Sequence, residues 1–318
     1  MQNKKILVVG SGISGLTSAL ALLRAGHDVT IISREKPGTF PHTSLSAYAM
    51  WVPVAYPDDD RFERWAFETC ERLVHLADLE GSGVRLRSIC VLKTEQSEPW
   101  YAGKMTNFRH GASGEFSAQY ADAHVLDGAP VIDPAKHLPW LYRQVVTAGG
   151  TFRQQEVATF DAVAEGFDVV VNCSGLGSRE LASDKTLFGE RVQVVTVRQT
   201  GFDKVIIDDE GPNKRACVVP HDDYIKLGAV FDGAVESLDV DLSLTADILA
   251  RCNAMAPELN VSLDDVISVV RAHRPERSAP RVELETLASG VKVFHNYGHD
   301  GMGYLLSYGI ADEIAATI

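Results

Sequence analysis

Residues 6–15 read ILVVGSGISG, and this stretch decides the fold class. Four consecutive apolar residues are typical of a buried strand, and a G-x-G-x-x-G turn follows them directly. After the turn, Ile13, Leu16 and Leu20 recur at helical spacing, and Gly26 predicts the end of that helix. Residues 29–32 then supply a second apolar strand. This order of strand, glycine turn, helix and strand predicts an α/β, Rossmann-like domain.

The three glycines have separate tasks in such a turn. Gly10 permits the tight turn, Gly12 leaves room for a pyrophosphate group, and Gly15 lets the helix pack closely on the strand. The phosphates would meet backbone N–H groups at Ile13 and Ser14, where the helix dipole is positive. We therefore expect this segment to bind the ADP half of a dinucleotide cofactor.

The end of the second strand leaves the identity of the cofactor open. An acidic side chain is expected there to bind the ribose, and the chain reads Ser33-Arg34-Glu35. Arg34 could bind a 2′-phosphate, which would favour NADP. Glu35 could bind the ribose instead, if the strand extends by one or two residues.

Composition narrows the class of protein. The 318 residues are 45% hydrophobic, enough for one or two domains with a sizeable core, and the net charge of -13 disfavours nucleic acid as a partner. Five cysteines without a C-x-x-C pair suggest free thiols and a reducing compartment, so cytoplasm is expected. No apolar run is long enough for a membrane span.

Cofactor-like segments stand at the beginning, middle and end of the chain. Patterning predicts helices over 62–79, 134–148 and 247–255 and from about 305, strands over 168–172 and 291–297, antiparallel strands within 191–231, and a loop or lid over 96–128. Such interleaving predicts two domains. The cofactor-binding domain would comprise 1–50, 132–190 and 285–318, and a smaller substrate domain on an antiparallel or mixed sheet would comprise 51–131 and 191–284.

A second glycine turn favours FAD over NADP. Residues 291–305 read VKVFHNYGHDGMGYL, so a strand leads through Gly298, Gly301 and Gly303 into a helix. The positive end of that helix would stabilise the negative charge of reduced flavin near N1 and the C2 carbonyl. NADP needs no second site of this kind.

At this point the chain resembles the D-amino acid oxidase family. The resemblance is carried by the segments 10–15 (GSGISG), 171–177 (VNCSGLG), 273–277 (HRPER) with Arg281, and 295–299 (HNYGH), and more weakly by 50–53 and 218–220. It implies noncovalently bound FAD and oxidation of an amino acid to its imino acid. The α-hydrogen would leave as hydride to flavin N5, and O2 would then be reduced to H2O2.

The resemblance also assigns residues. Arg274 would hold the substrate carboxylate as a two-pronged donor, and Gly301 would present its carbonyl to the substrate amine. Besides the first glycine turn and Arg34 or Glu35, the expected cofactor contacts are Thr43, Ser44, Val157, Cys173, Ser174, Gly175, Gly298, Gly301, Met302, Gly303, Tyr304 and Leu305. The expected substrate contacts are Arg274, Gly301, Trp51, Arg215, Cys217 and Asp300.

Departures from the family pattern leave the substrate open. Asn213 and Cys217 stand where two tyrosines are common, Val54 and His273 replace other aromatic residues, and Asp300 replaces a glycine. Arg215 could meet a second substrate carboxylate or lie in solvent. His295 and His299 are expected to be structural, with no metal.

Three interpretations therefore remain. The first is an oxidase of D-amino acids or of related amines that carry a carboxylate. The second is a flavin amine oxidase or dehydrogenase with a non-standard substrate, and the third is a flavin- or NADP-binding protein without turnover. A homodimer is compatible with each.

Overall fold

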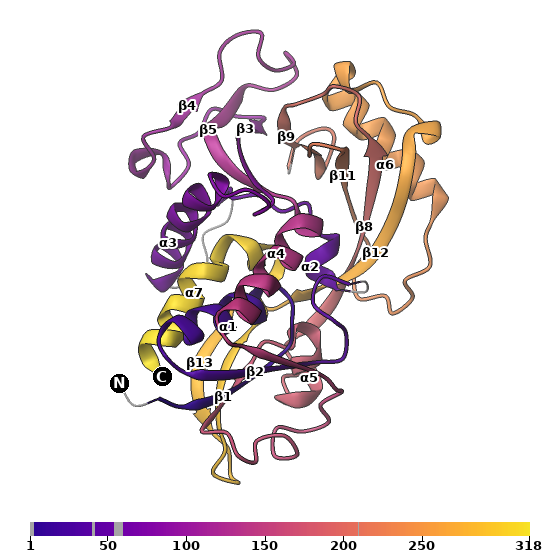
Figure 1. Ribbon diagram of the computed structural model, residues 1–318. Coiled ribbons are helices and arrows are strands. Elements are labelled where there is room, and N and C mark those ends of the chain that lie inside the picture. Colours follow the sequence, from indigo (N-terminus) through magenta and orange to yellow (C-terminus); the bar gives the residue numbers. More distant parts are fainter. Residues whose placement is uncertain (1–2, 40–41, 54–59, 209) are drawn as a thin grey trace.

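The protein folds around two β-sheets (Figure 1), in a computed structural model that describes residues 3–39, 42–53, 60–208 and 210–318. A six-stranded sheet has the order β13-β14-β7-β1-β2-β6, and an eight-stranded sheet has the order β12-β8-β11-β10-β9-β3-β5-β4. The strands of the first sheet are β1 (Lys5–Val9), β2 (Asp28–Ser33), β6 (Thr151–Gln154), β7 (Val169–Asn172), β13 (Arg281–Thr286) and β14 (Lys292–Tyr297). Those of the second are β3 (Val84–Lys93), β4 (Phe108–His110), β5 (Asp122–Ile132), β8 (Phe188–Arg198), β9 (Val205–Asp208), β10 (Ala216–Pro220), β11 (Tyr224–Phe231) and β12 (Val266–Glu276).

The six-stranded sheet collects strands from the beginning, middle and end of the chain. Strand β1 pairs in parallel with β2 and β7, so that Val8 lies opposite Ile31 and Val171. Only β13, at one edge, runs antiparallel to its neighbour β14. Residues 6–9 of β1 and 169–171 of β7 are apolar and buried, as expected where both faces of the sheet are covered. This arrangement confirms the α/β, Rossmann-like fold class.

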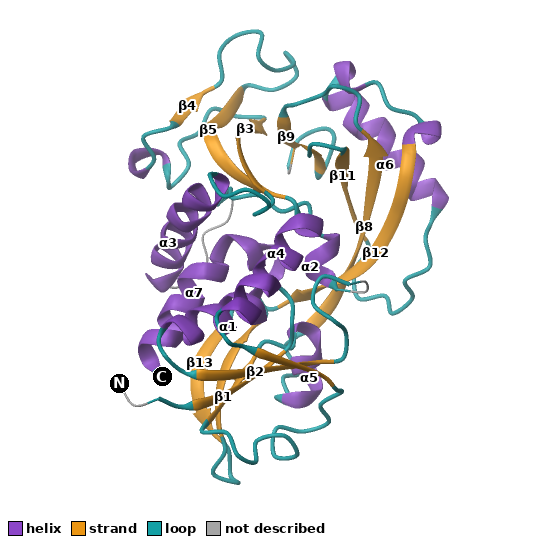
Figure 2. Cartoon of the chain, in the orientation of Figure 1, coloured by secondary structure: helices purple, strands orange, loops and turns teal. Residues whose placement is uncertain are grey.

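Helices fill the space between this sheet and the β3–β5 end of the other sheet (Figures 1 and 2). They are α1 (Ile13–Arg24), α3 (Asp60–Ala77), α4 (Pro134–Thr147) and α7 (Gly303–Thr317). Helix α7 packs on both α1 and α3. The start of α7 is thereby fixed against the glycine turn at the start of α1.

Part of the eight-stranded sheet packs with α6 in a second core, while its β3 and β5 strands join the core under the helices. Its strands pair antiparallel except for β3 with β9, and α6 (Leu242–Met255) packs on β8, β10 and β11. Strands β8 to β11 confirm the expected antiparallel strands within 191–231. Two short helices follow strands of the six-stranded sheet: α2 (Thr43–Ser46) comes after β2, and α5 (Ser178–Leu181) comes after β7.

Several predicted bounds need correction. The expected loop over 96–128 contains β4 and the first half of β5, because His110 pairs with His124 in a hairpin. Strands β12 and β13 were not predicted, and α6 begins at Leu242. Strand β13 begins at Arg281 and so crosses the predicted boundary at 284, which favours a boundary before residue 281. The division into two domains stays a prediction.

Candidate active site

The first glycine turn packs directly on the chain that leaves β7. Gly10 has a φ of 110°, and a Cβ on it would lie 2.2 Å from the carbonyl oxygen of Cys173. A Cβ on Gly15 would lie 2.1 Å from the carbonyl oxygen of Gly10. No side chain fits at either position, so the close packing of the turn on Cys173 and on α1 requires glycine at both.

The N-terminus of α1 begins at the glycine turn and has no cap from its own N-cap side chain. Gly12 occupies the cap position without a side-chain hydrogen bond, and the first turn holds no acidic residue. The Oγ atom of Ser44 lies in front of it and accepts a hydrogen bond from the N–H of Ile13 at 3.1 Å. A Cβ on Gly12 would come within 2.9 Å of that Oγ atom. The expected contacts Gly12, Ile13 and Ser44 therefore line one small cradle.

The N-terminus of α7 meets that of α1. Met302 occupies its cap position, again without a side-chain hydrogen bond, and a Cβ on Gly303 would lie 3.7 Å from Cγ2 of Ile13. The Tyr304 hydroxyl donates to the carbonyl oxygen of Ser44 at 3.0 Å. Two positive helix ends thus converge, which fits a cofactor with a pyrophosphate at one point and an anionic ring at another.

The remaining cofactor segments border the same edge of the sheet. Ser11 donates to the carbonyl oxygen of Glu35 at 3.2 Å, so the end of β2 lies beside the glycine turn. The side chain of Arg34 is 69% exposed, and its Nε atom is 3.7 Å from Glu35. Val157 packs under the sheet against the cluster of Leu7, Val9 and Ile32. The cofactor contacts predicted for Arg34, Glu35 and Val157 stay predictions.

A buried hydrogen-bond network supports the central segment. Asn172 joins Ser174, Ser178 and His295 through its side-chain amide, and Cys173 donates to Ser18. His295 also meets Glu285 at 2.9 Å. His299 is hydrogen-bonded to Asn296 at 2.9 Å, and burial lowers its pKa to about 4. Both histidines therefore have structural partners near the turns.

Arg274, the expected carboxylate anchor, lies at the end of β12 among three carboxylates. Its Nη2 atom is 2.7 Å from Glu190 and its Nε atom is 3.0 Å from Glu276 and 2.7 Å from Asp300. A Cβ on Gly301 would lie 3.1 Å from Nη1, so the backbone at Gly301 is next to the guanidinium. Arg274 and Gly301, two of the six expected substrate contacts, are thus neighbours, and their roles stay predictions.

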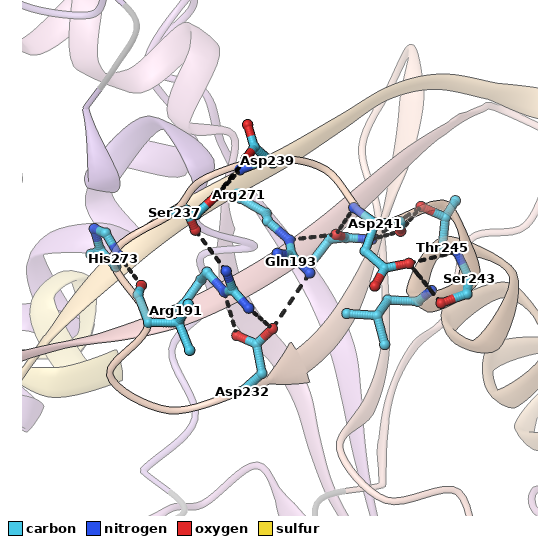
Figure 3. A network of polar contacts seen from close by, with 12 residues as sticks. Arg191, Gln193, Asp232, Ser237, Asp239, Asp241, Ser243, Thr245, Arg271 and His273 are labelled. Atoms are coloured by element: carbon cyan, nitrogen blue, oxygen red, sulfur yellow. Dashed lines mark hydrogen bonds and ion pairs between the residues drawn. The ribbon is translucent and has the colours of Figure 1, made fainter.

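The strands that carry Arg274 are held by a second polar network (Figure 3). Arg191 forms a two-pronged ion pair with Asp232, at 2.8 and 2.6 Å. Buried Arg271 donates to Gln193 at 2.7 Å and lies 3.4 Å from Asp232. His273 contacts the carbonyl oxygen of Val235 at 2.8 Å and lies beside this network (Figure 3). The side chain before Arg274 is therefore hydrogen-bonded to the protein's own backbone.

Other expected substrate contacts differ in their surroundings. Trp51 is 0% exposed, and its Nε1 atom donates to the carbonyl oxygen of Ala66. Its assignment as a substrate contact stays a prediction. Cys217 is also buried, and Asn213 donates to Tyr120. Arg215 lies over the ring of Phe231 at 4.4 Å.

The arginine spacing after Arg274 has a structural explanation. Arg277 pairs with Asp184 at 2.9 Å, and Arg281 pairs with Glu283 and Glu285. These side chains brace the chain between β12 and β14, and of the three arginines Arg274 is the one that lies beside Gly301. Val54, the other replaced aromatic position, lies outside the described residues.

The structure also brings together residues that the sequence did not single out. His110, Asp122 and His124 place one side-chain ligand atom each within 4.8 Å of one another on the β4–β5 hairpin. Their contacts are internal: His110 meets Asp122 at 2.9 Å, and His124 meets the carbonyl oxygen of Ser97 at 2.7 Å. The sequence also did not single out Glu190 and Glu276. The strand register brings them to Arg274, because Glu190 lies opposite it and Glu276 follows it by two residues on β12.

Fold and site together define a dinucleotide-dependent oxidoreductase. A family model described as FAD dependent oxidoreductase matches residues 5–317. A D-amino-acid oxidase of Rubrobacter xylanophilus is 35% identical over 98% of this chain and 95% of its own length. Human D-aspartate oxidase is 31% identical over 100% of this chain and 95% of its own length. The chain belongs to this DAO family, and its cofactor is FAD.

Structural similarity supports the same fold. The solved structure of a glycine oxidase from Geobacillus kaustophilus has a TM-score of 0.82 and 16% identity, covering 99% of this chain and 95% of that one. Within the described residues, no helix combines the length and the apolar character needed to cross a membrane.

Proposed function

We propose that the protein oxidises a D-amino acid, or a related amine that carries a carboxylate, to the imino acid. Bound FAD would supply the oxidant that accepts the α-hydrogen as hydride, and O2 would reoxidise it with release of H2O2. The substrate nitrogen loses a proton in the same overall oxidation. The curated relatives named D-amino-acid oxidase and D-aspartate oxidase support this substrate class.

The observation that carries the proposal is the approach of Arg274 to Gly301, beside the start of α7. The guanidinium offers N–H donors to a carboxylate, and the Gly301 carbonyl offers an acceptor to the amine. Fixing a substrate at both groups orients its Cα–H bond, which is the main task of the protein in a hydride transfer. The helix ends at Gly12 and Met302 support noncovalent FAD beside this point.

Colour and bleaching test the proposal. The purified protein should show a flavin spectrum, and one amino acid should bleach it under anaerobic conditions. Peroxide formed in air then separates an oxidase from a dehydrogenase. A protein that carries FAD yet is bleached by dithionite and by no amine would support the reading without turnover.

Arg274→Lys tests the anchor. We expect the affinity for the substrate to fall by about 2–5 kcal/mol, since lysine cannot replace a planar donor facing a carboxylate. Arg198→Lys, at an arginine that is 63% exposed, is the matched control. Equal substrate affinity in Arg274→Lys and the wild type would remove Arg274 from the site. A cytoplasmic location and a homodimer belong to the same proposal and need separate measurements.

A further inference from the structure

A lysine lies buried in the middle of strand β11. Lys226 is 7% exposed and stands opposite Thr196 of β8 and Val219 of β10 in the strand register. In the part of the chain that the structure describes, no carboxylate forms an ion pair with its ammonium, and its hydrogen bonds go to backbone oxygens. Burial lowers the pKa of this ammonium to about 8, the direction expected when a cation leaves water. The contacts that hold Lys226 there must therefore offset a cost of desolvation.

The ammonium reaches the end of the short helix α2. Its Nζ atom donates to the carbonyl oxygen of Leu45 at 3.1 Å and to that of Ala47, the residue after α2, at 2.6 Å. Carbonyl groups at the end of a helix lack partners within the helix. A charged donor makes stronger hydrogen bonds than a neutral one, so Lys226 ties the end of α2 to β11. Helix α2 also contacts α4 and strand β12 (Figure 1).

Strand β11 is shaped to receive the following residue as well. Gly228 comes two residues after Lys226 and so belongs to the same face of the strand. A Cβ on Gly228 would lie 2.6 Å from the Cε1 atom of Tyr48, and a larger residue would have to displace that ring. Residues 45–48 are thus held on β11 by a buried cation and by a position without a side chain.

The same segment forms part of the cofactor cradle. Ser44 accepts a hydrogen bond from the first turn of α1 through its side chain, and one from Tyr304 in α7 through its carbonyl oxygen. The Oγ1 atom of Thr43 donates to the carbonyl oxygen of His273 in β12 at 3.0 Å. Residues 43–47 therefore contact both helix ends that converge on the cofactor and two strands of the eight-stranded sheet.

We propose that Lys226 is a positioning residue for FAD. Its two hydrogen bonds hold residues 43–47 in the conformation in which Ser44 meets α1 and α7, although the lysine itself lies in the other sheet. Binding of FAD therefore depends on the contact between β11 and α2. This role concerns the cofactor of the family and is independent of which amine the protein oxidises.

Dilution of the flavin-loaded protein tests this role, because released FAD is fluorescent and its amount gives the dissociation constant. Lys226→Met keeps the length of the side chain and removes its donors. Lys226→Gln keeps two N–H donors but loses the charge and part of the reach. The dissociation constant of FAD should rise by roughly tenfold or more in the methionine variant and by less in the glutamine variant. Lys204→Met, at a lysine beside β9 that is 59% exposed, is the matched control and should retain FAD as the wild type does.

A double variant shows whether Lys226 acts through residues 43–47. Tyr304→Phe removes the hydrogen bond to Ser44 from the opposite side of the segment. Because either exchange already releases the segment, Lys226→Met with Tyr304→Phe should bind FAD within about threefold of the weaker single variant. Fold-changes that multiply would mean that Lys226 acts elsewhere, and would overturn the proposal. Wild-type FAD affinity in every Lys226 variant that folds would do the same, and so would failure of both to fold, since the fold as a whole would then require the lysine.

Discussion

The Nε atom of Arg274 lies 2.7 Å from the Oδ1 atom of Asp300. Asp300 itself has a left-handed backbone conformation, with a φ of 54°. Such a conformation costs a non-glycine residue roughly 1 kcal/mol, and asparagine and aspartate tolerate it best among them. The turn into α7 thus keeps a carboxylate beside the anchor where glycine would fit the backbone better. Asparagine and glycine at this position separate the effect of charge from that of conformation.

Asp300→Asn and Asp300→Gly should both strengthen binding of a simple carboxylate such as propionate. Each exchange removes a negative charge next to Arg274, and a gain of about 1.4 kcal/mol corresponds to tenfold tighter binding. Spectral titration of the flavin measures this affinity. If the glycine variant alone gains affinity, backbone strain is the cause and the charge argument is wrong.

Gly12→Ala should weaken FAD binding, whereas Gly15→Ala should prevent folding. The added methyl at Gly12 would meet a side-chain atom, Oγ of Ser44, so we expect a folded protein that retains less FAD on gel filtration. At Gly15 it would meet the backbone oxygen of Gly10, which cannot move aside, so the folded state itself should be lost. Gly12→Ala combined with Ser44→Gly should recover part of the FAD. No recovery would show that the methyl group meets the cofactor itself.

Acid should destabilise the protein through His137 in α4. Its Nδ1 atom contacts the carbonyl oxygen of Ser82 and its Nε2 atom contacts the Tyr308 hydroxyl, and burial lowers its pKa to about 4. The unfolded chain, with a pKa near 6.5, takes up the proton first. This contribution is therefore complete above pH 6.5 and is lost as the pH falls toward 4, by about 3 kcal/mol in all.

Urea unfolding at several pH values between 7.5 and 4.5 measures this loss. His137→Gln should flatten the dependence of the unfolding free energy on pH, and His75→Gln, at an exposed histidine, controls for the exchange itself. His221 and His299, whose pKa burial also lowers to about 4, will retain part of the slope. An unchanged slope in His137→Gln would contradict the assignment.

The sequence predicted the cofactor half of the fold because its signals are local. The glycine turn at 10–15 and the strand and turn at 292–303 each combine an apolar run with glycines that the backbone requires. These features depend on residues close to each other in the chain. The pairing of Arg274 with Gly301 was implied instead by the resemblance to the D-amino acid oxidase family.

What the sequence could not predict depends on long-range packing. Trp51 is enclosed against α3, and no local pattern in the sequence reveals that burial. Glu190 lies 84 residues before Arg274 in the chain, and only the β8–β12 register brings the two side chains together. The negative charge around the anchor was therefore invisible until the strands were paired.

Glu313 in α7 should be more sensitive to substitution than an exposed carboxylate of the same helix, because it holds α3 against the helix that begins at the active site. It is 15% exposed and accepts hydrogen bonds from Arg61, Arg64 and the Nε1 atom of Trp65. Bonds to a charged group contribute about 1.5–3 kcal/mol when one partner is removed, so Glu313→Gln should lower the unfolding free energy by about that amount. Asp312→Asn is the matched control on the same helix, since its 3.4 Å pair with Arg72 is exposed and exposed pairs contribute roughly 0–1 kcal/mol. Denaturant midpoints of the two variants measure the difference, and equal midpoints would mean that α3 is held by apolar packing alone.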